Sequence, residues 1–154
     1  MKRKCEIMTL MVGYDDSPAS RAALALAADR SRLIKAKLLI VHSMQTGSEV
    51  TLKDIKSVAA SLHEKEDFIK EQGICCEAHL LTRGQEPGED IVEFAKEHSV
   101  DEIIIGIKKQ SRLEKLLLGS TAQFVILHAT CPVTTTKSFD SRSTSAQSGQ
   151  APAA

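Results

Sequence analysis

The sequence is poor in aromatic residues and has no excess of charge of either sign. Its 154 residues include one tyrosine, four phenylalanines and no tryptophan. Proteins that bind single-stranded nucleic acid stack bases on aromatic side chains, and this sequence offers no group of them for that purpose. The 20 acidic residues balance the 20 basic ones, so the formal net charge is zero. This balance argues against nucleic-acid binding through a general basic field.

Long apolar runs are absent as well. No stretch approaches the roughly 20 apolar residues that a membrane-spanning helix needs. The basic start of the chain is followed by the apolar run 7–12, which is interrupted by Thr9. This run is shorter than the roughly 7–15 residues in the apolar part of a secretory signal peptide, and no small-residue cleavage site follows it. We therefore expect a cytoplasmic protein without a membrane partner.

Cysteine and histidine are few, and their spacing does not match a metal site. The four cysteines form no Cys-x-x-Cys pair, and the neighbours Cys75 and Cys76 would point to opposite faces of a strand. We expect the cysteines to be small buried hydrophobic residues. The five histidines are scattered along the chain. The sequence therefore predicts no metal site.

Apolar runs alternate with helical patterns along most of the chain. Short apolar runs predict strands over 6–12, 37–43, 74–82, 101–107 and 133–136. Residues at helical spacing predict helices over 18–35 and 50–73, a helix beginning at Pro87, and a last helix over 120–129. Ser17 is expected to cap the first helix, and Pro18 suits its first turn. The inner face of that helix is predicted to carry Leu24, Ala27, Ala28 and Leu33.

This alternation predicts an α/β fold, a doubly wound five-stranded parallel sheet with helices on both faces. The nearly continuous apolar runs agree, because such strands are buried on both sides. We expect one folded domain over residues 1–137. Residues 138–154 are mostly Ser, Thr, Gln, Ala, Gly and Pro. They offer too little apolar surface to order themselves, so a disordered C-terminal tail is predicted.

The strand order 3-2-1-4-5 would bring the carboxyl ends of the first and fourth strands together, where open α/β sheets bind ligands. Two unusual loops follow these strands. "GYDDSP" follows the first strand, and either Asp15 or Asp16 offers a carboxylate to ribose hydroxyls. His42, at the end of the second strand, is a candidate to lie near a base. The second loop follows the fourth strand and carries four cations, Lys108, Lys109, Arg112 and Lys115.

Glycines bracket this cationic loop. Gly106 would let the backbone approach a ligand without obstruction by a Cβ atom. Gly119, Ser120 and Thr121 begin the last helix, where free N–H groups and hydroxyls can bind an anion. Structural explanations stay open for each feature: a helix cap, a turn and a solvated face. Because the chain has no Walker A, Gly-x-Gly-x-x-Gly or nucleophile-elbow pattern, the residues alone predict only a doubly wound domain with an anion site.

The segments "MVGYDDSPASRAALALA" and "GIKKQSRLEKLLLGSTAQFVILHATCPV" resemble the universal stress protein family. The resemblance covers residues 6–136 and implies the five-stranded fold, a homodimer, and membership of a family with ATP-binding and non-binding groups. Binding members carry Gly-x2-Gly-x9-Gly-Ser/Thr. Here Gly106 and Gly119-Ser120 fill that pattern, and Lys109 replaces the second glycine, as in a variant loop of archaeal members. The likeness matches Asp15 to the acid that contacts the nucleoside and Val41 to the apolar residue beside adenine.

The resemblance implies that ATP or another adenine nucleotide binds, with or without magnesium. The implied binding residues are Gly13, Tyr14, Asp15, Val41, Gly106, Ile107, Lys108, Lys109, Gly119, Ser120 and Thr121. We expect Lys109 to exchange a close backbone approach for side-chain charge, so that ATP binds with a stronger dependence on salt.

The leading functional hypothesis is a nucleotide-dependent regulatory or interaction module of the stress response. A nucleotide-free dimeric adaptor is the alternative. A slow ATP hydrolase is less favoured, because no base for water is visible and no catalytic residue is predicted. The homodimer is expected to form through the last strand, "VTTTK", since threonine favours strands. The sequence does not identify a protein partner.

Overall fold

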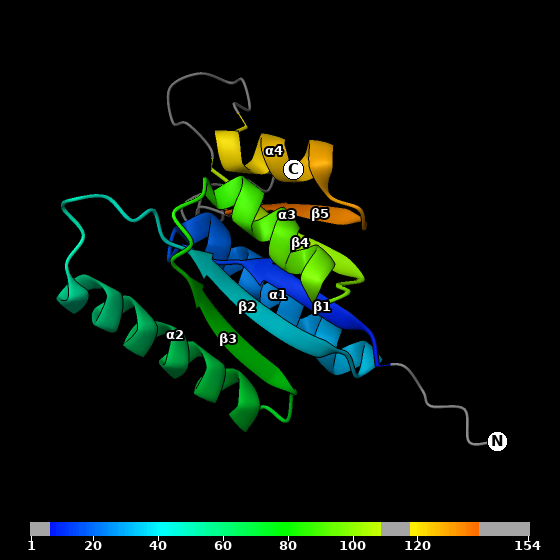
Figure 1. Cartoon of the computed structure of the whole chain (residues 1–154). Coiled ribbons are helices and arrows are strands. Elements are labelled where there is room, and N and C mark those ends of the chain that lie inside the picture. The colour runs from blue at the N-terminus through cyan, green and yellow to red at the C-terminus, as the bar shows by residue number, and fades with distance from the viewer. Residues whose placement is uncertain (1–6, 109–117, 139–154) are drawn as a thin grey trace, which may run out of the picture.

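The computed structural model describes residues 7–108 and 118–138. Five strands alternate with four helices in these ranges (Figure 1). In chain order the elements are β1 (Thr9–Gly13), α1 (Pro18–Ile34), β2 (Lys37–Ser43), α2 (Leu52–Glu71), β3 (Cys76–Leu81), α3 (Pro87–Glu97), β4 (Glu102–Ile107), α4 (Ser120–His128) and β5 (Val133–Lys137). The strands form one parallel sheet in the order β3-β2-β1-β4-β5. The predicted α/β fold and strand order are confirmed.

Local sequence signals explain where the first two helices begin. Ser17 caps α1, because its Oγ accepts a hydrogen bond from the backbone N–H of Ser20 at 3.2 Å. Thr51 and Asp54 form a capping box at the start of α2, in which each side chain accepts from the other residue's backbone N–H. Lys35 ends α1 in the left-handed conformation, with φ of 56°. These signals place the helix ends within two residues of the predicted boundaries.

The core has two layers, one on each face of the sheet. Helices α1 and α2 pack on one face and α3 and α4 on the other, as Figure 1 shows. Along β1, Leu10 and Val12 face the first pair of helices, whereas Met11 faces the second pair. All three side chains are fully buried. Burial on both faces explains why the strand reads as an uninterrupted apolar run.

Two predictions about burial are wrong. Leu33 was expected on the inner face of α1, but 83% of it is exposed. It follows Ala28 by five residues, which rotates it away from the buried stripe that ends at Ser31. Cys75 is exposed, whereas its neighbour Cys76 is buried. Cys75 precedes β3 and points away from the core, so the two cysteines differ in burial even though both were expected to be buried.

The sheet brings the carboxyl ends of β1 and β4 side by side. Leu10 is paired with Glu102, and Val12 with Ile104. All the strands are parallel, so each helix that follows a strand begins at this end of the sheet, and α1, α3 and α4 are among them. The loop ends and helix N-termini therefore meet at one edge. None of the helices in the described part of the chain is long and apolar enough to cross a membrane.

Candidate functional site

A cavity of about 340 Å³ lies at the carboxyl ends of β1 and β4. Its walls come from the ends of β1, β2 and β4 and from the first turns of α1, α3 and α4. Nine residues predicted for the site from the sequence line it together: Gly13, Tyr14, Asp15, Val41, Gly106, Lys108, Gly119, Ser120 and Thr121. Residues from loops that lie far apart in the chain thus meet around one space.

Two other candidates, Ile107 and His42, do not line the cavity. Ile107 is buried at the end of β4 and does not line the cavity. Lys109 lies outside the described residues. His42 is also absent from the lining, because it points to the opposite face of β2 from Val41. Burial lowers the pKa of His42, and the charges of Asp15 and Asp16 offset part of this effect.

Asp15 is the carboxylate at the cavity wall. The Lys108 Nζ atom lies 2.8 Å from its Oδ2, and the backbone N–H of Ser17 donates to its Oδ1 at 3.1 Å. Burial alone would raise the pKa of this carboxyl, but the hydrogen bonds from Lys108 and Ser17 outweigh burial and hold the pKa well below its usual range. Asp15 is therefore ionised at neutral pH and can accept hydrogen bonds from a ligand.

The neighbouring acid, Asp16, has a different environment. Its Oδ1 accepts hydrogen bonds from the Tyr14 hydroxyl at 2.9 Å and from Arg21 Nε at 3.0 Å. It adopts the left-handed conformation, with φ of 63°, and does not line the cavity. Burial, followed by the hydrogen bond to Asp16, raises the pKa of Tyr14 to about 12. Of the two acids left open by the sequence, the structure brings Asp15 to the cavity.

The start of α4 supplies hydrogen-bond donors to the same space. Gly119 is the N-cap and makes no side-chain cap, so the backbone N–H groups of the first turn have no partner within the helix. Ser120 and Thr121 add their hydroxyl groups to the lining. The positive end of the helix dipole also favours an anion at this position. This part of the cavity suits a phosphate or a carboxylate.

Gly106 has a packing role in addition to the ligand contact that the sequence predicts. The sequence predicted that it lets the backbone approach a ligand, but a Cβ here would lie 2.4 Å from the carbonyl oxygen of Ala19 and 2.7 Å from the backbone nitrogen of Ser20. The missing side chain therefore lets α1 pack directly against β4. Gly106 also lines the cavity, but glycine is required at this position because α1 packs against it.

Several lining residues were not identified from the sequence. Pro87, Ile91 and Ile105 form an apolar wall beside Val41. Ser43 adds a hydroxyl at the end of β2. Strand alternation contained a signal for Ser43, since it lies two residues after Val41 and shares its face. No sequence signal placed α3 beside this space, because that contact depends on how α3 and α4 pack together.

The cavity joins three kinds of surface. Apolar side chains suit a flat ring, an ionised carboxylate suits hydroxyl groups, and free N–H groups with a nearby ammonium suit an anion. No three His, Cys, Asp or Glu side chains gather to hold a metal ion within residues 7–108 and 118–138. The chemistry therefore fits an organic anion with hydroxyl groups.

Comparison with known proteins gives consistent matches. The sequence matches the universal stress protein family over residues 6–137. A universal stress protein of Thermus aquaticus is 28% identical over 131 residues, which are 81% of this chain and 95% of that protein. The structure of the universal stress protein from Archaeoglobus fulgidus is similar with a TM-score of 0.74 and 38% identity, over 83% of this chain and 97% of that chain. A structure of the Archaeoglobus fulgidus protein in complex with dAMP gives a TM-score of 0.68 and 33% identity, over 83% and 96% of the two chains. This chain belongs to the universal stress protein family.

Proposed function

We propose that this protein binds an adenine nucleotide in the cavity and acts as a nucleotide-dependent regulatory or interaction module of the stress response. The observation that carries the proposal is the convergence of Asp15, Val41 and the start of α4 on one space of about 340 Å³. A cavity of this size falls in the range of small-molecule sites. A relative 33% identical to this chain has been solved in complex with dAMP, which supports the same ligand class.

Each part of the nucleotide has a matching surface. The base would lie against Val41, Ile91 and Ile105, which form the apolar wall. The ribose hydroxyls would donate to the Asp15 carboxylate, which is ionised and already bonded to two donors. The α-phosphate would meet the backbone N–H groups at the start of α4.

Lys108 would serve the phosphates. Its side chain is 67% exposed, so the ammonium group can turn from Asp15 toward an anion at little cost. Lysine binds phosphate as a mobile point charge rather than through a fixed geometry. When ATP carries magnesium, the phosphates and water are its usual ligands. We propose no resident metal ion.

A nucleotide-free adaptor is the second candidate, and one observation favours it. The ion pair of Lys108 with Asp15 engages the acceptor that a ribose would use.

In either case we propose a homodimer that pairs through β5. This strand lies at the edge of the sheet and exposes backbone groups beside three threonines, Thr134, Thr135 and Thr136. Light scattering coupled to size exclusion tests the dimer.

Native mass spectrometry of the purified full-length protein separates the two candidates. A nucleotide-binding module retains an added mass of AMP, ADP or ATP, or acquires it on incubation with the nucleotide. Equilibrium dialysis with labelled ATP gives the affinity. If no nucleotide is retained and none binds at about millimolar ATP, well above the micromolar range of common cofactor sites, the adaptor is supported and nucleotide binding is excluded.

A further inference from the structure

The half-buried Ser43 and the buried Asp90 form a polar pair beside the apolar wall of the cavity. Ser43 ends β2 and lies on the same face as Val41, two residues earlier. Asp90 lies in the first turn of α3 and is fully buried. The Ser43 hydroxyl donates a hydrogen bond to Asp90 Oδ2 at 2.6 Å. Asp90 itself does not line the cavity, so it reaches a ligand only through Ser43.

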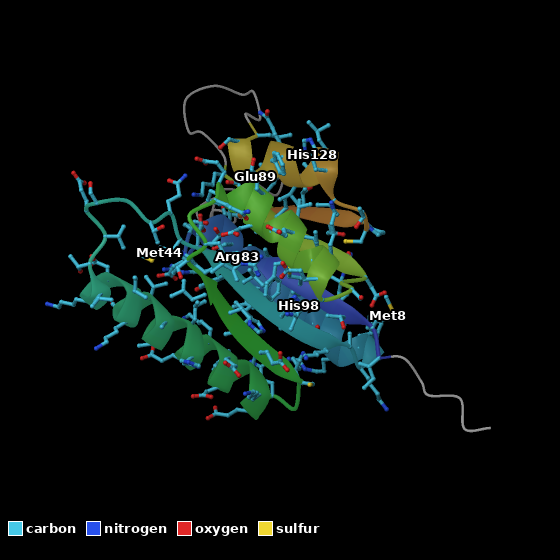
Figure 2. All side chains as sticks on the ribbon, in the orientation of Figure 1. Met8, Met44, Arg83, Glu89, His98 and His128 are labelled. Atoms are coloured by element: carbon cyan, nitrogen blue, oxygen red, sulfur yellow. The ribbon has the colours of Figure 1, made fainter. Side chains whose placement is uncertain are left out.

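The geometry of the pair sets its direction, because a carboxylate oxygen accepts and the Ser43 hydroxyl donates. The first turn of a helix stabilises an anion through the helix dipole. Arg83 donates two hydrogen bonds to Glu97, at 3.0 and 2.8 Å, and its Nε lies 3.9 Å from Asp90 Oδ1, which has no hydrogen-bond partner among the described residues. In Figure 2, Glu89 lies near the beginning of α3 and His98 toward its other end, with Arg83 beside the helix between them. Ser43 is therefore the donor and Asp90 the acceptor of this hydrogen bond.

The direction of this hydrogen bond determines what Ser43 offers to the cavity. A serine hydroxyl has one proton and two lone pairs. Because the serine donates its one proton to Asp90, only its lone pairs remain for a ligand. Ser43 can therefore accept a hydrogen bond from a ligand N–H group, and it cannot donate one to a carbonyl oxygen.

We infer that Ser43, oriented by Asp90, is a specificity-determining residue that accepts a hydrogen bond from the 6-amino group of adenine. This inference rests on the proposed nucleotide site. A base packed against Val41 brings its edge toward Ser43, which follows on the same face of β2. A purine without an amino group at this position leaves the Ser43 lone pairs unpaired on binding, which weakens its affinity.

The test compares AMP with purine riboside 5′-monophosphate, which lacks only the 6-amino group. Titration calorimetry of the full chain should show that the wild type prefers AMP by about 5-fold, the usual effect of one hydrogen bond. Ser43→Ala should remove this preference by weakening AMP while leaving the affinity for the analogue unchanged. Ser43→Thr, which keeps the hydroxyl, should retain the preference. Ser57→Ala, at an exposed serine of α2, is the matched control and should behave as the wild type.

Asp90→Asn tests the positioning role directly. The amide oxygen would face Arg83, so its NH₂ group would face Ser43 and occupy the lone pairs. The preference for AMP should then fall as in Ser43→Ala, while a thermal unfolding curve confirms that the variant folds. If wild-type protein binds both ligands equally, or if Ser43→Ala weakens both equally, the inference is wrong and nucleotide binding stands. If the wild type binds neither ligand, nucleotide binding itself is wrong and the inference falls with it.

Discussion

The Lys108 ammonium lies 2.8 Å from the Asp15 carboxylate, and both groups line the cavity. The two side chains are 67% and 46% exposed, so solvent screens their attraction, which contributes less than about 1 kcal/mol. The pair is therefore weak enough to open when a ligand binds. Once it opens, each member has a separate role: Asp15 can accept from hydroxyl groups, and Lys108 can approach a phosphate.

Lys108→Met should separate these roles. Without the ammonium, no lysine competes with the ribose hydroxyls for the Asp15 carboxylate, so the affinity for adenosine should stay the same or rise slightly. The affinity for ATP should fall by up to about 1 kcal/mol at physiological ionic strength, and more at low salt. Titrations of both ligands at two salt concentrations measure the difference. Lys56→Met, at an exposed position on α2, is the control. A parallel loss for adenosine and ATP would show that Lys108 does not act on the phosphates.

The two glycines of the predicted nucleotide motif should respond differently to alanine. Gly106→Ala places a methyl group 2.4 Å from the Ala19 carbonyl oxygen, so α1 must shift. We expect this variant to lose more than about 2 kcal/mol of unfolding free energy. The methyl group of Gly119→Ala meets no atom within 4 Å. The only loss comes from alanine being a weaker N-cap residue than glycine, and it costs less than about 1 kcal/mol of unfolding free energy. Urea denaturation of both variants gives the comparison. Equal losses would mean that α1 does not pack closely on β4.

Cys75 and Cys76 should differ in reactivity although they are neighbours. Cys75 is exposed, whereas Cys76 is buried in the core between β3 and the helices α1 and α2. Burial, followed by the charge of Glu66, raises the pKa of the Cys76 thiol to about 12. Iodoacetamide should therefore modify Cys75 in the folded protein and Cys76 only after denaturation. Peptide mass spectrometry identifies the labelled residue, and rapid native labelling of Cys76 would contradict the register of β3.

Alkaline pH should destabilise the fold for the same reason. The pKa of Cys76 is raised from 9.0 to about 12, and that of Tyr14 from 10.0 to about 12. Both groups hold their protons more tightly in the folded state, so the associated stability is complete below the unfolded pKa values. It is lost as the pH rises from 9.0 toward about 12. Melting temperatures over this range should fall, and Tyr14→Phe should reduce the slope. A melting temperature that stays constant over the range would contradict the burial of both groups.

Much of the fold could be predicted from the sequence because its signals are local. Buried strands such as β1 read as apolar runs, and Ser17-Pro18 marks a helix start. Asp15 could be identified as a site residue because it follows a strand at the switch point of the sheet. The strand order itself follows from the general rules for parallel α/β sheets together with the family resemblance.

The rest depends on contacts between distant segments. The close approach of α1 to Gly106 is invisible in either segment alone, so the sequence does not indicate this packing role. The pairing of Ser43 with Asp90 joins residues 47 positions apart, and neither has a distinctive neighbour in the sequence. The residues alone leave Asp15 and Asp16 open and only the family resemblance favours Asp15, because the contacts of Asp16 with Tyr14 and Arg21 are not visible in the sequence. The role of Lys109 stays a prediction, since it lies outside the described residues.

The central claim is that Asp15 binds the sugar of an adenine nucleotide, and a pair of acidic variants tests it most directly. Titration calorimetry with AMP should show that Asp15→Ala loses about 1–3 kcal/mol of binding free energy, the effect of removing a charge-assisted hydrogen bond. Asp16→Gly removes the adjacent carboxylate at a position whose φ of 63° suits glycine, so it should bind AMP as the wild type does. Equal affinities for the wild type and Asp15→Ala, or a loss confined to Asp16→Gly, would contradict the account.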